Sequence, residues 1–177
     1  MSQLEPKIYV ACLAAYNSGR LHGEWIDANQ DAASLEQAVQ KIISTSPVWN
    51  AEEWAIHDLE DFGAVRLSDE SLENISEIAV FIAEHGELGA ALVDDFNNDV
   101  ESAKQTLEED YYGAYANEEE FARNFFCEII GEFGNEGVST LENLMIYIDF
   151  EKYARDLFTN DFFYLKVRYT FHVFRNT

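Results

Sequence analysis

Short apolar runs separated by turn residues fill the first part of the chain. Residues 8–14 form an apolar run of strand length, and residues 21–27 form another. Between them, residues 16–19 (Tyr-Asn-Ser-Gly) favour a tight turn, so we predict a β-hairpin. After Pro47, residues 54–59 return to a strand pattern. The segment is therefore predicted to contain three strands.

A helix is predicted between the second and third of these strands. Residues 34–37 (Ser-Leu-Glu-Gln) have the pattern of a capping box, and Pro47 ends the helical pattern. Apolar residues recur at helical spacing, which gives the helix one apolar side. They are Leu35, Ala38, Val39, Ile42 and Ile43.

From residue 68 onward the pattern has the period of helices. One side of the first predicted helix is apolar, and a narrow stripe of glutamates lies on the opposite side. The apolar side is formed by Leu72, Ile75, Ala79 and Ile82. The stripe is formed by Glu70, Glu73, Glu77 and Glu84. His85-Gly86 suits the C-terminal end of this helix.

Further helical segments are predicted toward the end of the chain. They are residues 88–96, 100–112 and 118–131, followed by a loop marked by the glycines at 131, 134 and 137. A last helical stretch over residues 139–157 begins with a Ser-x-x-Glu cap. With the three strands near the start, these segments predict an α+β fold.

The tail, residues 162–174, is rich in aromatic and β-branched residues and is predicted to form a hairpin. Residues 158–177 contain seven of the 25 aromatic residues of the chain. Such a cluster must be buried, either in its own fold or against another subunit, and the sequence leaves both open.

The charge of the chain is strongly and unevenly negative. Asp and Glu number 34 against 11 Lys and Arg, for a formal net charge of -23. Residues 1–68 contribute -6, residues 69–156 contribute -19, and residues 157–177 contribute +2. Binding to nucleic acid through phosphates needs clustered Lys and Arg, so this class of function is excluded. The partner is expected to be basic, cationic or indifferent to charge.

The residues show no motif for catalysis, metal binding or a cofactor. The chain contains no nucleophile elbow, no glycine loop that cradles phosphate and no histidine pair at ligand spacing. Asp95-x-Asn97-x-Asp99 begins like a calcium loop, but Val100 stands where that loop needs glycine. We therefore predict a protein that is not an enzyme, with no cofactor and no dedicated metal site.

Cysteine use and hydropathy indicate a cytoplasmic protein. Cys12 and Cys127 both stand in apolar stretches, which predicts buried free thiols in a reducing compartment. The start of the chain has no secretion signal, and the longest apolar run, residues 78–83, is too short to cross a bilayer.

Three interpretations of the carboxylates compete: a solvated surface for solubility, adaptation to salt, or a specific role. Like charges at helical spacing destabilise a helix by a few tenths of a kcal/mol per pair, and solubility does not need a charge of -23. A dimer of this chain would carry as many charges as about 78 Å of duplex DNA. Two chains of this size placed end to end would reach roughly 80 Å. The charge of a dimer, spread over its length, is therefore high enough to imitate that of duplex DNA.

Three segments of the chain carry a resemblance to a known family. They are Ile8–Asp27 (IYVACLAAYNSGRLHGEWID), Glu53–Asp58 (EWAIHD) followed by Phe62-Gly63, and Tyr147–Leu157 (YIDFEKYARDL). In this order the chain resembles the ArdA-type antirestriction proteins over nearly its full length.

The resemblance implies a function and a mechanism. Proteins of this family come from mobile genetic elements, imitate bent duplex DNA and occupy the DNA site of type I restriction-modification enzymes. The chain is thereby expected to inhibit restriction of incoming DNA, for example in conjugation, and the sequence leaves open whether modification is blocked as well. It is expected to meet the DNA-binding groove of the methyltransferase core and not to bind nucleic acid or a membrane itself. The alternative is an acidic interaction module or regulator that binds a basic partner unrelated to restriction.

The resemblance also implies an elongated homodimer with three small domains in each chain. For this sequence we place an N-terminal α+β domain at residues 1–68, with the three-stranded sheet and its helix. A central acidic helical domain follows at 69–112. The C-terminal α+β domain, residues 113–177, holds helices and the aromatic hairpin.

Two sets of site residues follow. The carboxylates expected to stand in for phosphates are Glu70, Glu73, Glu77, Glu84, Asp94, Asp95, Asp99, Glu101, Glu108, Glu109, Asp110, Glu118, Glu119 and Glu120. The late segment of the resemblance is associated with antirestriction and dimer contact. Its candidate residues are Tyr147, Asp149, Tyr153, Arg155 and Asp156.

Overall fold

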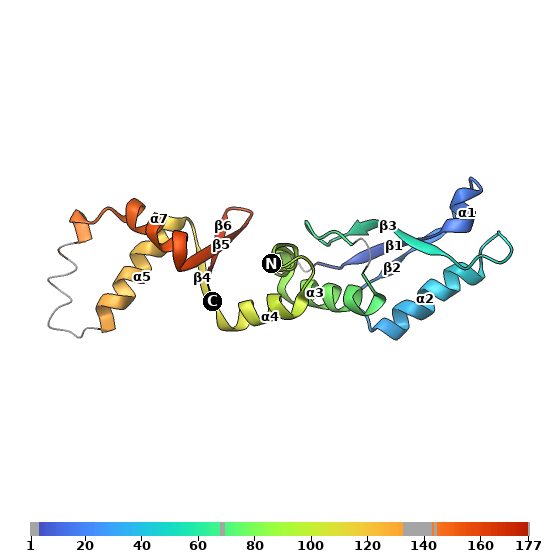
Figure 1. Ribbon diagram of the computed structural model, residues 1–177, viewed down its shortest axis with the longest axis horizontal. Coiled ribbons are helices and arrows are strands. Elements are labelled where there is room, and N and C mark those ends of the chain that lie inside the picture. The colour runs from blue at the N-terminus through green and yellow to red at the C-terminus, as the bar shows by residue number, and fades with distance from the viewer. Residues whose placement is uncertain (1–3, 68–69, 133–142, 144, 177) are drawn as a thin grey trace. The chain divides into compact units, whose positions relative to one another are not determined.

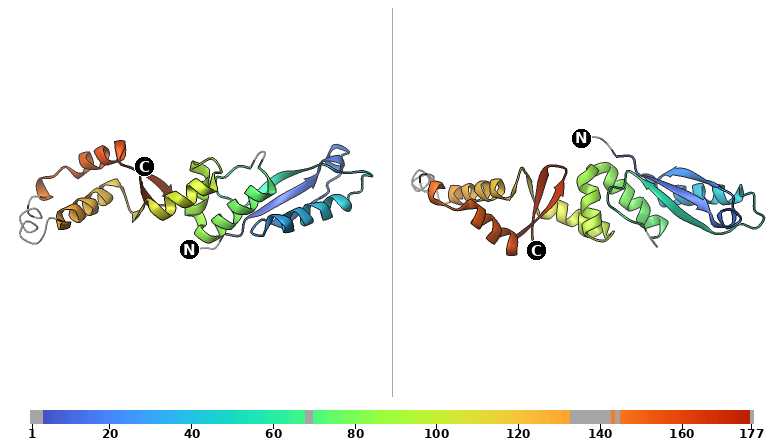
Figure 2. Two further views of the ribbon diagram at one scale, coloured as in Figure 1. Left: turned by 60° about the horizontal axis from the view of Figure 1, so that its bottom comes forward. Right: turned by 90° about the horizontal axis from the view of Figure 1, so that it is seen from above.

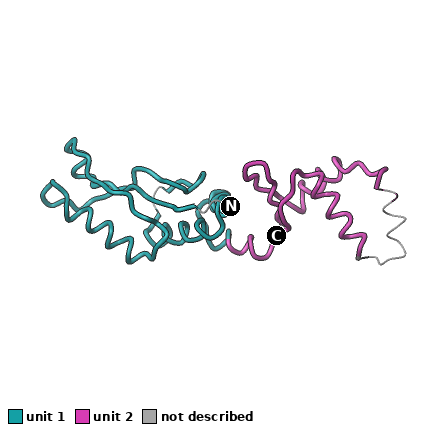
Figure 3. The backbone as a smooth tube through the Cα atoms, turned by 180° about the vertical axis from the view of Figure 1, so that it is seen from behind, with its two compact units in different colours: residues 1–103 teal, residues 104–177 magenta. Residues whose placement is uncertain are grey.

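The computed structural model describes residues 4–67, 70–132, 143 and 145–176. Helices and two small antiparallel sheets make up these residues, which confirms the predicted α+β fold (Figure 1). The chain divides into two compact units, residues 1–103 and 104–177 (Figure 3). The division into three domains stays a prediction.

The sheet of the first unit has the strand order β2-β1-β3. Its strands are β1 (Lys7–Cys12), β2 (Gly23–Asp27) and β3 (Trp54–Glu60), which confirms the three predicted strands. The central strand β1 pairs antiparallel with both neighbours, and a β-bulge in β3 shifts the second register. The three strands are therefore held together by pairing between residues that are distant in sequence.

One side of this sheet is packed against α2 (Ala32–Ser44). Side chains that alternate along β1 and β2 point toward the helix, whose predicted apolar side is buried except for the half-buried Ala38. The buried residues are Ile8, Val10, Cys12, Ile26, Leu35, Val39, Ile42 and Ile43. The opposite side of the sheet carries the remaining residues of each strand.

Two details of this unit differ from the sequence prediction. The predicted cap at Ser34 is wrong, because the helix begins one turn earlier and the Asp31 carboxylate accepts a hydrogen bond from the Ser34 amide. The predicted hairpin is confirmed by the antiparallel pairing of β1 with β2, and Ser18 and Gly19 lie in a turn, but the connection is longer than the turn alone. A short helix, α1 (Leu13–Asn17), follows β1 directly, and its apolar residues had extended the apparent strand.

The long helix α3 (Leu72–Asp95) follows in the same unit. The Ser71 hydroxyl caps it by accepting a hydrogen bond from the Asn74 amide. Helical geometry is broken at Gly86, where φ is 63° and ψ is -143°, and resumes afterwards. The predicted stop therefore lies at a kink between two helical pieces, in a conformation that glycine adopts at little cost.

The predicted helix over residues 100–112 is too long. Helix α4 spans Val100–Glu109, and Tyr111–Tyr115 forms the strand β4. This strand pairs with β6 (Thr170–Arg175), about sixty residues later in the chain. Local periodicity could not show this strand, because a partner distant in sequence decides its conformation.

The second unit contains a sheet of order β4-β6-β5 and two helices that lie side by side (Figure 2). Strand β5 (Phe162–Val167) and β6 form the predicted tail hairpin, with Arg168 at a φ of 55° in its turn. The helices are α5 (Glu118–Glu132) and α7 (Phe150–Asn160). Aromatic side chains from the helices and the sheet therefore share one core.

Burial resolves the question of the aromatic tail for part of its residues. Phe162 and Phe174 are buried within the unit itself, in contact with rings of the same unit. Phe163 and Phe171 are half-buried, whereas Tyr169, in the turn, is exposed. Most of the tail aromatics thus find their partners in their own fold.

Three further expectations can be compared with the structure. Cys12 is buried as predicted, but Cys127 is exposed on α5. Gly131 lies inside α5 and not in a loop, whereas Gly134 and Gly137 lie outside the described residues. The cap predicted at Ser139 and Glu142 also lies outside them. The last long helix begins at Phe150, after the short 3-10 helix η1 (Met145–Tyr147).

Candidate functional site

Three of the four predicted stripe glutamates lie on one side of α3. Glu73, Glu77 and Glu84 are exposed, and their spacing of four and seven residues brings them within about 40° of one another around the helix axis. The opposite side is buried, as Ile75, Ala79 and Ile82 show. Burial of the apolar side thus fixes the direction in which these carboxylates point.

The fourth residue of the stripe, Glu70, precedes the helix. Its carboxylate accepts a hydrogen bond from the side-chain amide of Asn98. Glu70 is half-buried, in contrast to the three exposed glutamates of α3. Its carboxylate therefore helps to hold the loop after α3, whereas the carboxylates of the other three glutamates point into solvent.

Local hydrogen bonds favour the ionised form of Glu73. Its own backbone amide and the Ser71 hydroxyl hold the pKa of the Glu73 carboxyl below its usual range. Glu73 also lies in the first turn of α3, where the helix dipole favours a negative charge. This carboxylate is therefore charged throughout the neutral pH range.

Asp94 and Asp95 occupy the last turn of α3 and are exposed. A helix C-terminus carries partial negative charge, so an acid there costs roughly 0.3–1 kcal/mol where a base would stabilise. The last turn of α3 contains no basic residue. These two carboxylates lie where they weaken the helix.

Helix α4 begins with an acid that stabilises it. Asp99 caps the helix, because its carboxylate accepts hydrogen bonds from the Ser102 amide at 3.1 Å and from the Ser102 hydroxyl at 2.7 Å. The hydroxyl and then the amide keep the pKa of Asp99 below its usual range. Glu101 follows in the first turn and is exposed.

Helix α4 ends with two acids that do not stabilise it. Glu108 and Glu109 are exposed in the last turn, which contains no basic residue. The side-chain amide of Gln105 donates to the Glu109 carboxylate at 3.1 Å. A neutral amide leaves the charge in place, so α4 repeats the arrangement at the end of α3.

Asp110 differs from the other predicted carboxylates because it is buried, with 9 % of its surface exposed. Its backbone amide donates to the Thr106 carbonyl, and its own carbonyl accepts from the Arg175 amide. The residue thus joins α4 to the sheet of the second unit. We therefore leave Asp110 out of the exposed carboxylate set.

The three glutamates at the start of α5 have three different settings. Glu120 accepts a hydrogen bond from the Ala116 amide, while the Asn117 side chain accepts one from the Glu120 amide. Glu119 forms an ion pair with Arg123 at 2.8 Å. Glu118 accepts a hydrogen bond from the Tyr164 hydroxyl, which raises the pKa of that tyrosine.

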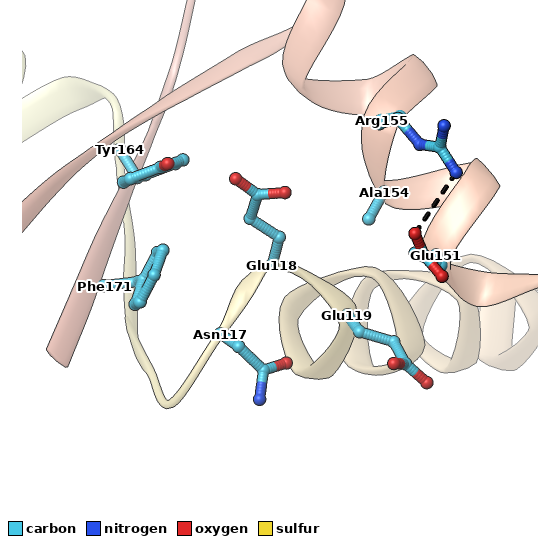
Figure 4. Close-up of a pocket in the computed structure, with 8 residues that line it drawn as sticks. All are labelled: Asn117, Glu118, Glu119, Glu151, Ala154, Arg155, Tyr164 and Phe171. Atoms are coloured by element: carbon cyan, nitrogen blue, oxygen red, sulfur yellow. Dashed lines mark hydrogen bonds and ion pairs between the residues drawn. The ribbon is translucent and has the colours of Figure 1, made fainter. Parts of the chain in front are cut away.

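A hollow of about 410 Å³ lies beside Glu118 (Figure 4). Tyr164 and Phe171 line one side of it, and Glu151 and Arg155, 3.3 Å apart, line another. The carboxylate of Glu118 lies between these two sides (Figure 4). Most of the charged groups around the hollow already have partners within the same unit.

The residues of the late segment do not form one cluster. The Asp149 carboxylate caps α7 by accepting from the Lys152 amide at 3.0 Å, and Arg155 pairs with Glu151. Tyr153 packs against aromatic rings, and burial raises its pKa. Tyr147, by contrast, is 79 % exposed in η1.

Asp156, the remaining late residue, is exposed on α7. Ile146 beside Tyr147 is exposed as well. The late segment thus presents a short apolar surface at η1 and stabilising contacts on α7.

Acids greatly outnumber bases in the central part of the chain. Between residues 70 and 120 the sequence contains fifteen acids and a single Lys or Arg, Lys104. Glu87, which the sequence analysis did not include, is one of the fifteen and lies half-buried on α3. Sequence reasoning found the acids of this region, but it could not tell a capping acid or the buried Asp110 from an exposed one.

Two searches bear on what this surface can do. Within the ranges that the structure describes, His, Cys, Asp and Glu form no group of three or more with the geometry to hold a metal ion. No helix in the same ranges is long and apolar enough to span a membrane.

Comparisons with known proteins identify the family. A search of curated proteins finds no relative that matches this chain. The family model described as antirestriction protein (ArdA) matches residues 8–171 of the 177. The match runs from β1 to the start of β6, and the chain therefore belongs to the ArdA family of antirestriction proteins.

Proposed function

We propose that this protein inhibits type I restriction-modification enzymes by occupying their DNA-binding groove in place of duplex DNA. The family implies antirestriction. The observation that carries the proposal is the set of exposed acids on α3 and α4 with a single base among them. Acids at both helix C-termini reduce stability, so their presence is better explained by a partner than by the fold.

In the proposed mechanism no bond is made or broken. The groove of a DNA-binding enzyme presents Lys and Arg side chains to phosphates. Exposed carboxylates held by rigid helices would meet the same cations and displace the same counterions. The buried apolar side of α3 supports this role, because it holds Glu73, Glu77 and Glu84 in fixed directions.

The partner and assembly are part of the same proposal. The target surface is the DNA groove of the methyltransferase core, so modification would be blocked together with restriction. Two chains would act as a homodimer, which doubles the length and charge presented to the groove. The exposed side chains of Ile146 and Tyr147 are candidates for contact between the copies.

The decisive experiment is cleavage of unmodified DNA by a purified type I enzyme, titrated with this protein. We expect inhibition that excess duplex DNA relieves, with an apparent affinity that falls steeply as salt rises. Inhibition that saturating DNA leaves unchanged would contradict occupation of the groove. Absence of any inhibition, with the protein folded, would move the assignment to a regulator that binds another basic partner.

A further inference from the structure

The sheet of the first unit has a second side that α2 does not cover. Alternation along the strands places Tyr9 of β1, Trp25 of β2 and Asp58 of β3 on this side, with Tyr9 between the other two as the direct cross-strand neighbour of each. The next row, two residues along, consists of Lys7, Asp27 and Glu60. We call these six residues the open face of the sheet.

Two aromatic rings on the open face are held in place. The rings of Tyr9 and Trp25 meet edge to face, with centroids 5.5 Å apart. Gly23 makes room for them: a Cβ there would lie 3.0 Å from the Tyr9 ring and 2.5 Å from the Val10 carbonyl oxygen. Trp25 nevertheless stays 46 % exposed. A large ring is therefore fixed and still open to a partner.

The charges around these rings are mainly negative. Asp27, Asp58 and Glu60 are all exposed. The only base of the open face, Lys7, is half-buried, and its ammonium group lies 3.7 Å from the Glu5 carboxylate. The face thus combines an exposed indole with three carboxylates and little positive charge.

We infer that the open face binds an arginine-bearing polypeptide segment, with the guanidinium group over Trp25 and its N–H donors toward the carboxylates of the same face. Arginine fits both features at once, because its plane stacks on an aromatic face and its donors match a carboxylate. Lysine offers only a point charge. Phosphate groups would be repelled by the three acids, which excludes nucleic acid as the occupant.

This inference goes beyond the proposed function. The open face lies on β1, β2 and β3, whereas the proposed imitation of DNA rests on the acids of α3 and α4. An indole has no counterpart in a row of phosphates, so the open face would recognise side chains and not a charge pattern. Its binding can also be tested without any restriction enzyme.

The test is an NMR titration of the full chain with two short acetylated peptides, Gly-Arg-Gly-Arg-Gly and the same peptide with lysines. The reporter is the indole N–H of Trp25. The indole of Trp49, which is 91 % exposed in a loop of the same unit, is the internal control. We expect the arginine peptide to shift the Trp25 signal selectively and to bind about two- to fivefold tighter than the lysine peptide.

Variants separate the ring from the charge. Trp25→Ala is expected to abolish the preference for arginine, Trp25→Phe to keep part of it, and Trp49→Ala to leave it unchanged. Glu60→Gln is expected to weaken the binding of both peptides. The matched control is Glu36→Gln, which removes the same charge from an exposed position of α2 outside the open face.

Equal binding of both peptides by the wild type, or equal shifts at Trp25 and Trp49, would overturn the inference and leave only general attraction to an acidic protein. If Trp25→Ala fails to fold by circular dichroism, the wild-type comparison of the two indoles decides. A negative result here leaves inhibition of restriction untouched, because that assay depends on other residues.

Discussion

Helices α3 and α4 use their acids differently from helices α5 and α7. On α3 and α4, acids occupy the last turns, where no base accompanies them. On α5 and α7, Glu119 and Glu151 each pair with an arginine four residues later, and Asp149 caps a helix. Helices α3 and α4 together contain nine acids and one base, whereas α5 and α7 contain seven acids and three bases, so acids of α5 and α7 more often have a basic partner on the same helix.

Under the proposed function, the acids of α3 and α4 serve the partner, whereas ion pairs and caps serve stability. Surface pairs four residues apart stabilise a helix by about 0.3–0.5 kcal/mol each, and a cap by about 1 kcal/mol. Acids at helix C-termini destabilise the helix instead. Selection for stability alone would place bases at the ends of α3 and α4, so the acids there agree with the proposed role in binding a partner.

The largest expected effect is that of salt on inhibition. If about six to ten carboxylates replace phosphates, the apparent affinity for the restriction enzyme should fall by roughly 10³–10⁵ between 50 and 200 mM salt. The measurement is the inhibition constant at a series of salt concentrations with the same enzyme. Duplex DNA of known length provides the control slope. A slope near zero would refute the charge-based role of α3 and α4.

Reversal of the α3 glutamates should have the next largest effect. Glu73, Glu77 and Glu84 changed together to Lys are expected to weaken inhibition by about 100-fold or more, because like charges in an interface cost several kcal/mol. Glu73→Lys alone should cost only a few fold, since the interaction is distributed.

The matched control makes the same change of charge at positions outside α3 and α4. Glu36, Glu52 and Glu53 are exposed outside α3 and α4, and their joint change to Lys alters the net charge by the same amount. We expect a much smaller loss of inhibition from this control. Equal losses from the two triple variants would show that net charge, and not position, decides inhibition.

The sequence predicted those features of the molecule that depend on local pattern. The apolar sides of α2 and α3, the tail hairpin and the break at Gly86 follow from periodicity and residue type. Strand β4 was missed because its partner, β6, is distant in sequence. Composition also could not show that Asp110 is buried, since burial depends on tertiary packing and not on residue type.

Removal of the α7 cap should affect stability without affecting inhibition. Asp149→Ala removes the acceptor for the Lys152 amide, which should lower the free energy of unfolding of the second unit by about 1 kcal/mol. Urea unfolding monitored by circular dichroism measures it, and Asp149→Asn, which keeps an acceptor, should recover most of the loss. A strong loss of inhibition by the folded Asp149→Asn variant would instead place this carboxylate in the interface with the partner.

The smallest expected effect is a gain in stability rather than a loss. Asp95→Lys places a base in the last turn of α3, which should raise the free energy of unfolding of the first unit by about 0.5–1 kcal/mol. The same change should weaken inhibition a few fold, because it removes one proposed phosphate substitute. Asp95→Asn should give about half of each effect, and urea unfolding with inhibition assays on the three proteins measures both.

A variant that gained stability and kept full inhibition would show that Asp95 lies outside the contact, and the end of α3 would then need another explanation. If both quantities move as expected, this acid is retained at the expense of stability.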